Sequence, residues 1–301
     1  MAVAAHEDAD ADTRVRVICR VRPRAPGEVG DGQYAECLQV ESAESFVRVT
    51  KNAWDRPEAF AFDAVLPVNA SQRRVYDAVC LPVVEAVLGG ANGAVLAYGM
   101  TGSGKTHTMQ GSGNGVMRGI IPRAVEQILS QAKVMQAQRW QFTVSASFLE
   151  IYNENLRDLL VNLNLQDGAS SSSAQSRPSS AAASANQKLA IKRDRNQKSY
   201  VDGLTQHKID TENKEVGVQQ LEALMAAAAR ARSVATTKMN AQSSRSHSVF
   251  MLHLYGVNDD SGTIVEGSLN LCDLAGSERL DRSGAAADAK RLKETQAINK
   301  S

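Results

Sequence analysis

A glycine-rich turn of the form G-x-x-x-x-G-K-T at residues 99–106 constrains this chain more than any other feature. It follows a short apolar run at residues 94–98, which predicts a strand buried on both faces. Glycines let consecutive backbone N–H groups approach phosphate oxygens, while the lysine supplies charge and the threonine a magnesium ligand. We therefore predict a phosphate-binding loop formed by Gly99, Met100, Thr101, Gly102, Ser103, Gly104, Lys105 and Thr106.

The alternative for this motif is a chance glycine turn with an exposed lysine. The strand expected before the turn and the helix expected after it disfavour that alternative. The loop alone specifies neither the nucleotide nor the process that its energy drives.

Composition narrows the classes of function. The 301 residues are 43% apolar, which is enough for one large core or two modest ones. The formal net charge is +1, and no apolar run reaches membrane-spanning length, so we expect no nucleic-acid partner and no membrane insertion. The scattered cysteines fit a reducing, intracellular compartment, and the apolar runs around Cys19 and Cys272 predict buried thiols.

Strand-like and helix-like segments alternate along the chain. Apolar alternation predicts strands at residues 14–21, 46–50, 141–152, 248–257 and 268–274, with further short strands within 188–209. Helical spacing predicts helices at 71–88, with a kink at Pro82, and at 216–233. This order predicts an α/β, three-layer P-loop NTPase fold with a mixed central sheet flanked by helices.

Two segments are expected to lie outside that packed core. Residues 1–13 are rich in alanine and acidic residues and predict a disordered tail. Residues 168–185 are rich in serine and alanine and predict a flexible insertion within a single domain at 14–301.

Two further polar segments are candidates to sense the nucleotide. Asp273 ends an apolar strand, where it is well placed to hold Mg²⁺, and Gly276 allows a backbone N–H to reach a γ-phosphate. Taken alone, such an aspartate is also a common helix cap or turn residue. Residues 240–247, NAQSSRSH, form a run of small hydroxyl residues that is equally compatible with a solvated loop or a phosphorylation-prone linker.

In this order and spacing, the segments GMTGSGKT, NAQSSRSH and DLAGSE resemble the phosphate loop, switch I and switch II of kinesin motor domains. Other segments agree with that resemblance: RVRP at 20–23, AYG at 97–99, HTM at 107–109, FLEIYNE at 148–154, DLL at 158–160, YVDGL at 200–204 and LKETQAINKS at 292–301. The resemblance covers residues 14–301 apart from the insertion, and it is most similar to the C-terminal-motor, minus-end-directed branch. The family implies an ATPase that moves on microtubules in the cytoplasm.

The resemblance also assigns roles to individual residues. Arg20, Arg22 and Pro23 are expected to flank the adenine, with His107 on the other side of the ring. In switch I, Ser243 is expected near the attacking water and Ser244 near Mg²⁺. Arg245 and Glu278 are expected to form a salt bridge between the switches, and Glu278→Ala is expected to bind ATP but to hydrolyse it very slowly. Met100 stands where most kinesins have glutamine, and its side chain is expected to face the loop exterior.

The same resemblance predicts where a microtubule would bind. A helix that begins near Leu292 lies against tubulin in the family, and an acidic track favours basic contacts there. The candidate contacts are Lys290, Arg291, Lys293 and Lys300. An ordinary solvated basic helix face is the alternative.

In the kinesin family the domain continues beyond the segment that ends here at Ser301. We therefore expect a fold that is incomplete at the C-terminus, unstable or aggregating when expressed alone, with dimerisation possible only through segments absent from this sequence. A cooperative, monomeric melt with tight nucleotide binding would contradict that expectation.

Two other classes of function stay open at this point. A GTPase or a small-molecule kinase would share the phosphate loop, although the base-reading N-K-x-D of GTPases is not found and the switch I sequence speaks against both. The other class is a non-motile microtubule-binding module.

Overall fold

The computed structural model describes residues 15–24, 38–41, 45–50, 56–113, 115–161, 163, 189–195, 199–236 and 245–278. The chain divides into two compact units, Met1–Ser71 and Gln72–Ser301, each of which is described by itself. The expected acidic tail at 1–13 and the insertion at 168–185 lie outside the described residues.

The first unit consists of short strands in two small sheets. β1 (Ile18–Arg20) pairs in parallel with β5 (Ala64–Leu66). The other sheet is antiparallel, in the order β2 (Leu38–Glu41), β3 (Phe46–Val49) and β4 (Glu58–Ala61). The strands predicted at 14–21 and 46–50 are thus confirmed, each with narrower bounds.

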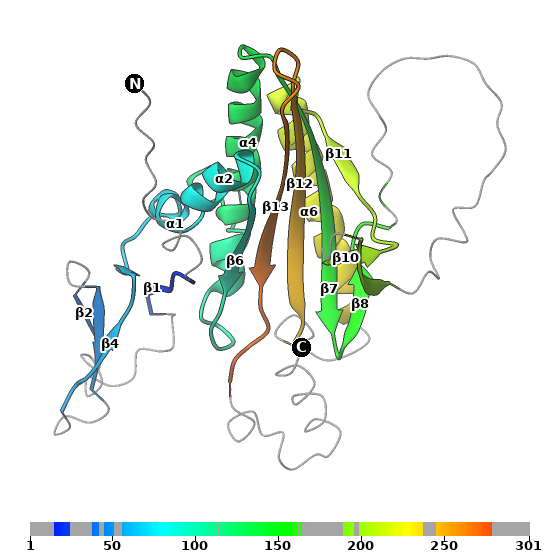
Figure 1. Cartoon of the computed structure of the whole chain (residues 1–301). Coiled ribbons are helices and arrows are strands. Elements are labelled where there is room, and N and C mark those ends of the chain that lie inside the picture. Colours follow the sequence, from blue (N-terminus) through cyan, green and yellow to red (C-terminus); the bar gives the residue numbers. More distant parts are fainter. Residues whose placement is uncertain are drawn as a thin grey trace, which may run out of the picture. The chain divides into compact units, whose positions relative to one another are not determined.

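A six-stranded mixed sheet is the centre of the second unit, and Figure 1 shows its long strands running side by side. Its main order is β11 (His207–Ile209), β7 (Trp140–Tyr152), β12 (His247–Asn258), β13 (Ile264–Asp273) and β6 (Asn92–Ala97), while β8 (Asn155–Asp158) pairs with β7. Only the β13–β6 pair is parallel among these described strands. A separate hairpin joins β9 (Ala190–Arg193) and β10 (Ser199–Asp202).

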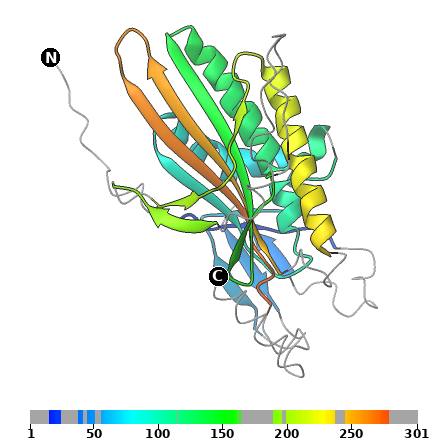
Figure 2. The ribbon, with the colours of Figure 1, turned by 90° about the vertical axis from the view of Figure 1, so that its right-hand side faces the viewer.

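Helices cover one face of this sheet. α4 (Ile120–Gln136) and α6 (Lys214–Thr236) contact each other and lie along the same face, as Figure 2 shows. Alternate side chains of β12 are buried on this side, because successive residues of a strand point to opposite faces. In the core, Phe148 and Phe250 meet edge to face, with ring centroids 5.4 Å apart. The prediction of an α/β fold with a mixed sheet and flanking helices is confirmed.

The helix predicted at 71–88 is two helices, α1 (Gln72–Val79) and α2 (Leu81–Leu88). The two helices meet at Cys80, and Pro82 lies in the first turn of α2. The Cys80 N–H still donates to the Tyr76 carbonyl at 2.8 Å and the Val84 N–H to the Cys80 carbonyl at 2.9 Å, so helical hydrogen bonds continue through the junction and the chain is kinked near Pro82, as the sequence predicted. No helix in the described part of the chain is long and apolar enough to cross a bilayer.

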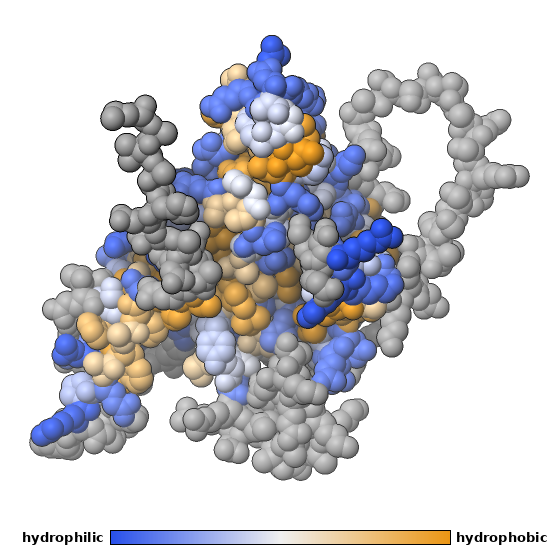
Figure 3. Space-filling model, in the orientation of Figure 1, coloured by the Kyte–Doolittle hydropathy of each residue, from blue (hydrophilic) through white to orange (hydrophobic). Residues whose placement is uncertain are grey.

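The prediction that β6 is buried on both faces is wrong. Val95 is buried, but Leu96 is 59% exposed. β6 is the edge strand of the described sheet, and among the described helices α2 and α3 contact it. Hydrophobic side chains consequently reach the surface over this part of the sheet (Figure 3). Among the described cysteines Cys80 is buried, whereas Cys19 and Cys272, which the sequence predicted to be buried, are only partly so.

Candidate nucleotide site

The glycine-rich turn connects β6 to the short helix α3 (Lys105–Met109). Gly104 precedes α3 in the left-handed region, with φ of 96°, a conformation that favours glycine. At Gly99 a Cβ would lie 2.6 Å from the Ser103 hydroxyl oxygen, so a side chain there would collide with Ser103. The predicted strand–loop–helix context of the phosphate loop is confirmed.

Lys105 is held over the turn by backbone oxygens. Its ammonium group donates to the carbonyl oxygens of Gly99 and Met100, each at 2.9 Å. Burial lowers the pKa of Lys105, and the nearby carboxylates of Asp273 and Glu278 oppose that shift. The Met100 side chain is 58% exposed, as expected for a side chain on the loop exterior.

The loop is joined directly to the end of β13. The Thr106 hydroxyl donates to Oδ2 of Asp273 at 2.6 Å. Asp273 is only 5% exposed, and within the described residues its Oδ1 has no hydrogen-bond partner. Burial raises the pKa of Asp273, while the Thr106 hydroxyl and nearby positive groups oppose the shift. A buried carboxylate oxygen without a partner is the kind of ligand that a divalent cation would satisfy.

The residues after Asp273 run along the turn. The Leu274 N–H donates to the Ala97 carbonyl at 3.3 Å, and the Ser277 N–H donates to the Gly99 carbonyl at 3.1 Å. A Cβ on Gly276 would collide with the Thr101 hydroxyl and with the Glu278 carboxylate. Gly276 therefore packs its backbone against the loop without a steric barrier, and its contact with a γ-phosphate stays a prediction.

Glu278 bonds to the loop itself. Its Oε2 accepts from the Thr101 N–H at 2.9 Å, and its Oε1 accepts from the Thr101 hydroxyl. Burial tends to raise the pKa of Glu278, but the hydrogen bonds from the side chain and backbone of Thr101 outweigh it, and the pKa is lowered. The sequence did not indicate this contact, and the salt bridge between Arg245 and Glu278 stays a prediction.

The beginning of β12 also contacts this region. The Ala275 N–H donates to Nδ1 of His247 at 3.2 Å, which joins the segment after Arg245 to the segment after Asp273. Ser243 and Ser244 lie outside the described residues, as do Lys290, Arg291, Lys293 and Lys300.

The residues expected around the adenine fall in both units. His107 lies in α3, whereas Arg20, Arg22 and Pro23 lie at and after the end of β1 in the first unit. Their arrangement around an adenine stays a prediction.

Gln72 supports the loop helix, and sequence reasoning missed it. It is 5% exposed, and its amide donates to the His107 carbonyl at 2.7 Å and to the Met117 carbonyl at 3.4 Å. The spacing could have indicated it. Gln72 precedes Val75 by three residues and Tyr76 by four, so it lies on the same buried face of α1 as these two side chains.

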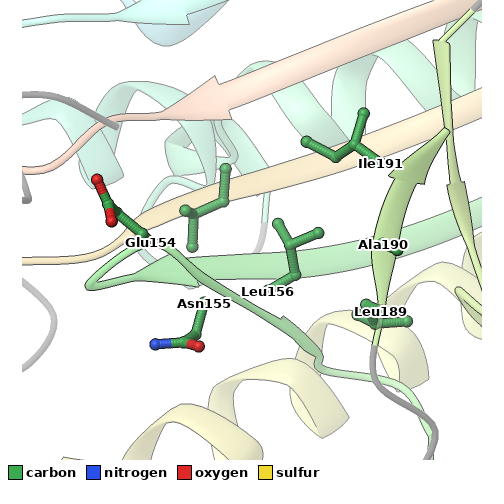
Figure 4. Close-up of a pocket in the computed structure, with 7 residues that line it drawn as sticks. Glu154, Asn155, Leu156, Leu189, Ala190 and Ile191 are labelled. Carbon is green, nitrogen blue, oxygen red and sulfur yellow. The ribbon is translucent and has the colours of Figure 1, made fainter.

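A cavity of about 410 Å³ lies elsewhere, between the β7–β8 hairpin and β9. Its lining is Ile151, Glu154, Asn155, Leu156, Leu189, Ala190 and Ile191 (Figure 4). None of these is a predicted site residue, and the lining is mainly aliphatic with no cationic group. The cavity therefore does not suit a triphosphate, and the glycine-rich turn remains the candidate site.

A phosphate loop after β6 and an acid at the end of β13 define a P-loop domain of the NTPase type. Comparison with known proteins specifies the family, because the model of the kinesin motor domain matches residues 20–301. This chain belongs to the kinesin motor domain family.

Several relatives carry the names of kinesins. "Kinesin-like protein KIN-14N" of Oryza sativa subsp. japonica is 41% identical over 290 residues, which cover 95% of this chain and 34% of that protein. "Carboxy-terminal kinesin 2" of Xenopus laevis is 38% identical over 300 residues, which cover 95% of this chain and 42% of that protein. A solved structure titled as that of a fast kinesin superposes with a TM-score of 0.76 at 32% identity, over 95% of this chain and 71% of that one.

The chain thus spans between a third and a half of the length of these two named relatives. The similarity to C-terminal kinesins agrees with the branch that the sequence motifs resembled.

Proposed function

We propose that this chain binds ATP with Mg²⁺, hydrolyses the ATP, and couples turnover to microtubule binding and movement. The observation that carries the proposal is the 2.6 Å hydrogen bond between Thr106 and the buried Asp273, which joins the phosphate loop to the second predicted switch. Membership of the kinesin family supports both the ATP chemistry and the track.

The residues present fit a magnesium ion. The Thr106 hydroxyl and the Asp273 carboxylate would hold it, with Ser244 as a further expected ligand. The fit is supported by Oδ1 of Asp273, which has no hydrogen-bond partner within the described part of the chain. When bound, the ion supplies neutralisation of the charge on the phosphate oxygens.

The chain's own groups bind and orient the nucleotide. Lys105 carries a positive charge at the turn, and the backbone N–H groups of the turn are suited to phosphate oxygens. Gly276 lets a backbone N–H approach the loop without a steric barrier. Glu278 and Arg245 are the groups proposed to close over the reacting phosphate and to orient the attacking water.

The proposal of microtubule binding rests on membership of the kinesin family and on the positive charge of four basic residues. Lys290, Arg291, Lys293 and Lys300 would meet the acidic surface of the track, which also favours rapid association at low salt. The cytoplasmic cytoskeleton is the compartment that follows from such a partner.

ATP turnover by Lys105→Ala tests the proposal against a control variant, Lys133→Ala. Lys133 is a lysine of α4 that donates to the Glu212 carbonyl at 3.4 Å at an exposed site. We expect Lys105→Ala to lower kcat by about 10²–10³-fold, because it removes a charge aimed at the phosphates, and the control to match the wild type. Unchanged turnover in Lys105→Ala would refute the assignment, and equal turnover of GTP would favour a different P-loop enzyme.

A further inference from the structure

Glu150 is a buried carboxylate that the proposed chemistry does not use. It lies in β7 and is only 2% exposed, and in the sheet register it pairs with Ser248 of β12. A buried charge is costly unless hydrogen bonds and opposite charges satisfy it, so the groups around Glu150 indicate what it does.

Groups from α6, from β8 and from the residue just before β12 converge on this carboxylate. The hydroxyl of Ser246, itself 1% exposed, donates to Oε1 at 2.7 Å. Nε of Arg232, in α6, lies 3.6 Å from Oε1, and Nη1 of Arg157, in β8, lies 3.5 Å from Oε2. Arg157 also donates from Nη2 to the Ala231 carbonyl of α6 at 2.9 Å.

The carboxylate therefore separates two guanidinium groups and binds a hydroxyl. Without its charge, Arg157 and Arg232 would face each other without the shared acceptor that now offsets their repulsion. Glu150 thus links the C-terminal part of α6 to the residue just before β12.

Arg245 is the residue that this anchor affects most directly, because it immediately precedes Ser246. Ser246 is tied to Glu150 on the helix-covered face of the sheet, and the next residue, His247, accepts from the Ala275 N–H. The two residues that follow Arg245 are thus each held by a separate contact, Ser246 by Glu150 and His247 by Ala275.

We propose that Glu150 is a positioning residue for Arg245, acting through Ser246. The inference rests on the proposed function, in which Arg245 pairs with Glu278 during hydrolysis. It assigns the buried Glu150 cluster a part in the hydrolysis step, distinct from nucleotide binding.

Single-turnover kinetics separates that role from general stability. Ser246→Ala removes the hydroxyl, and Glu150→Gln keeps an acceptor but removes the charge. Ser147→Ala is the matched control, because Ser147 is also fully buried in β7 while its hydroxyl has no hydrogen-bond partner within the described residues. We expect both test variants to hydrolyse bound ATP about 10–100-fold more slowly, with the affinity for a fluorescent ADP within about twofold of the wild type.

Hydrolysis at the rate of the Ser147→Ala control would overturn the proposal. A parallel loss of ADP affinity would also overturn it, because it would show a general structural role.

Amide hydrogen exchange of the nucleotide-free chain is a second measurement, and it does not depend on ATPase activity. Exchange at residues 245–249 is expected to accelerate in Ser246→Ala and Glu150→Gln, but not in Ser147→Ala. A wild-type chain that hydrolyses no ATP would refute the proposed function, and the exchange data would still decide the anchoring. Unchanged exchange in both test variants would overturn the anchor itself.

Discussion

Replacement of Asp273 by asparagine is expected to separate the stability of the fold from its response to magnesium. The aspartate is buried and its pKa is raised, chiefly by burial, so the nucleotide-free fold disfavours its charge. Such a group stabilises the fold in acid, and that contribution is lost as the pH rises through its folded pKa. At pH 7 the neutral asparagine avoids this cost, so nucleotide-free Asp273→Asn is expected to be at least as stable as the wild type.

The stabilisation by bound magnesium-nucleotide, by contrast, should be smaller in Asp273→Asn than in the wild type. A wild-type chain at a magnesium-nucleotide concentration of about 100 times its Kd gains about 2.7 kcal/mol of stability. At about 2–4 °C per kcal/mol, that gain corresponds to a rise of about 5–11 °C in Tm. Removal of a charged magnesium ligand that weakens binding about 100-fold reduces the gain to about 0.4 kcal/mol, or about 1–2 °C.

Thermal melts with and without magnesium-ADP measure both effects, in this chain where it melts cooperatively and in a version extended at the C-terminus where it aggregates alone, as its sequence predicts. Asp77→Asn is the control, because Asp77 lies in an exposed pair with Arg73 at 2.8 Å and exposed pairs contribute at most about 1 kcal/mol. The reasoning is refuted if Asp273→Asn keeps the wild-type rise in Tm, or if its nucleotide-free form melts well below the wild type.

Three further predictions concern single residues. Glu278→Ala should still bind ATP but turn it over very slowly in a phosphate-release assay, and near-normal turnover would remove Glu278 from the mechanism. Gly119→Ala should lower the free energy of unfolding by about 1–3 kcal/mol in urea, because its Cβ would lie 2.6 Å from backbone atoms of Gln110 and Gly111; an unchanged midpoint would contradict this. Burial raises the pKa of Cys80 to about 12, so iodoacetamide at pH 8 should modify this thiol only after denaturation, and rapid labelling of the native chain would show that it is accessible.

Much of the candidate site could be predicted from short segments of the sequence. The loop residues, the strand that ends at Asp273 and the alternation of β12 are all patterns within about ten consecutive residues. Local patterns of this kind determine where glycines are required and which strand ends in an acid. The structure confirms that these elements meet, through the bond between Thr106 and Asp273.

The contacts that sequence reasoning missed depend on register and on the order of the strands. Ser246 and Glu150 are 96 positions apart in the chain, and they meet only because β12 pairs with β7 in one register. Glu278 and Thr101, which are 177 positions apart, meet because β13 lies beside β6. The exposure of Leu96 likewise depends on the place of β6 at the edge of the described sheet, which its own apolar sequence does not reveal.

Stimulation of ATP turnover by microtubules is the most direct test of the proposed function. Monomeric chain, isolated by size-exclusion chromatography, would be assayed for phosphate release with and without polymerised microtubules, at low and at physiological salt. We predict that microtubules raise turnover at least about tenfold and that higher salt weakens their apparent affinity, because basic residues meet an acidic track. ATP turnover that is the same with and without microtubules, in a chain that binds nucleotide normally, would contradict the coupling.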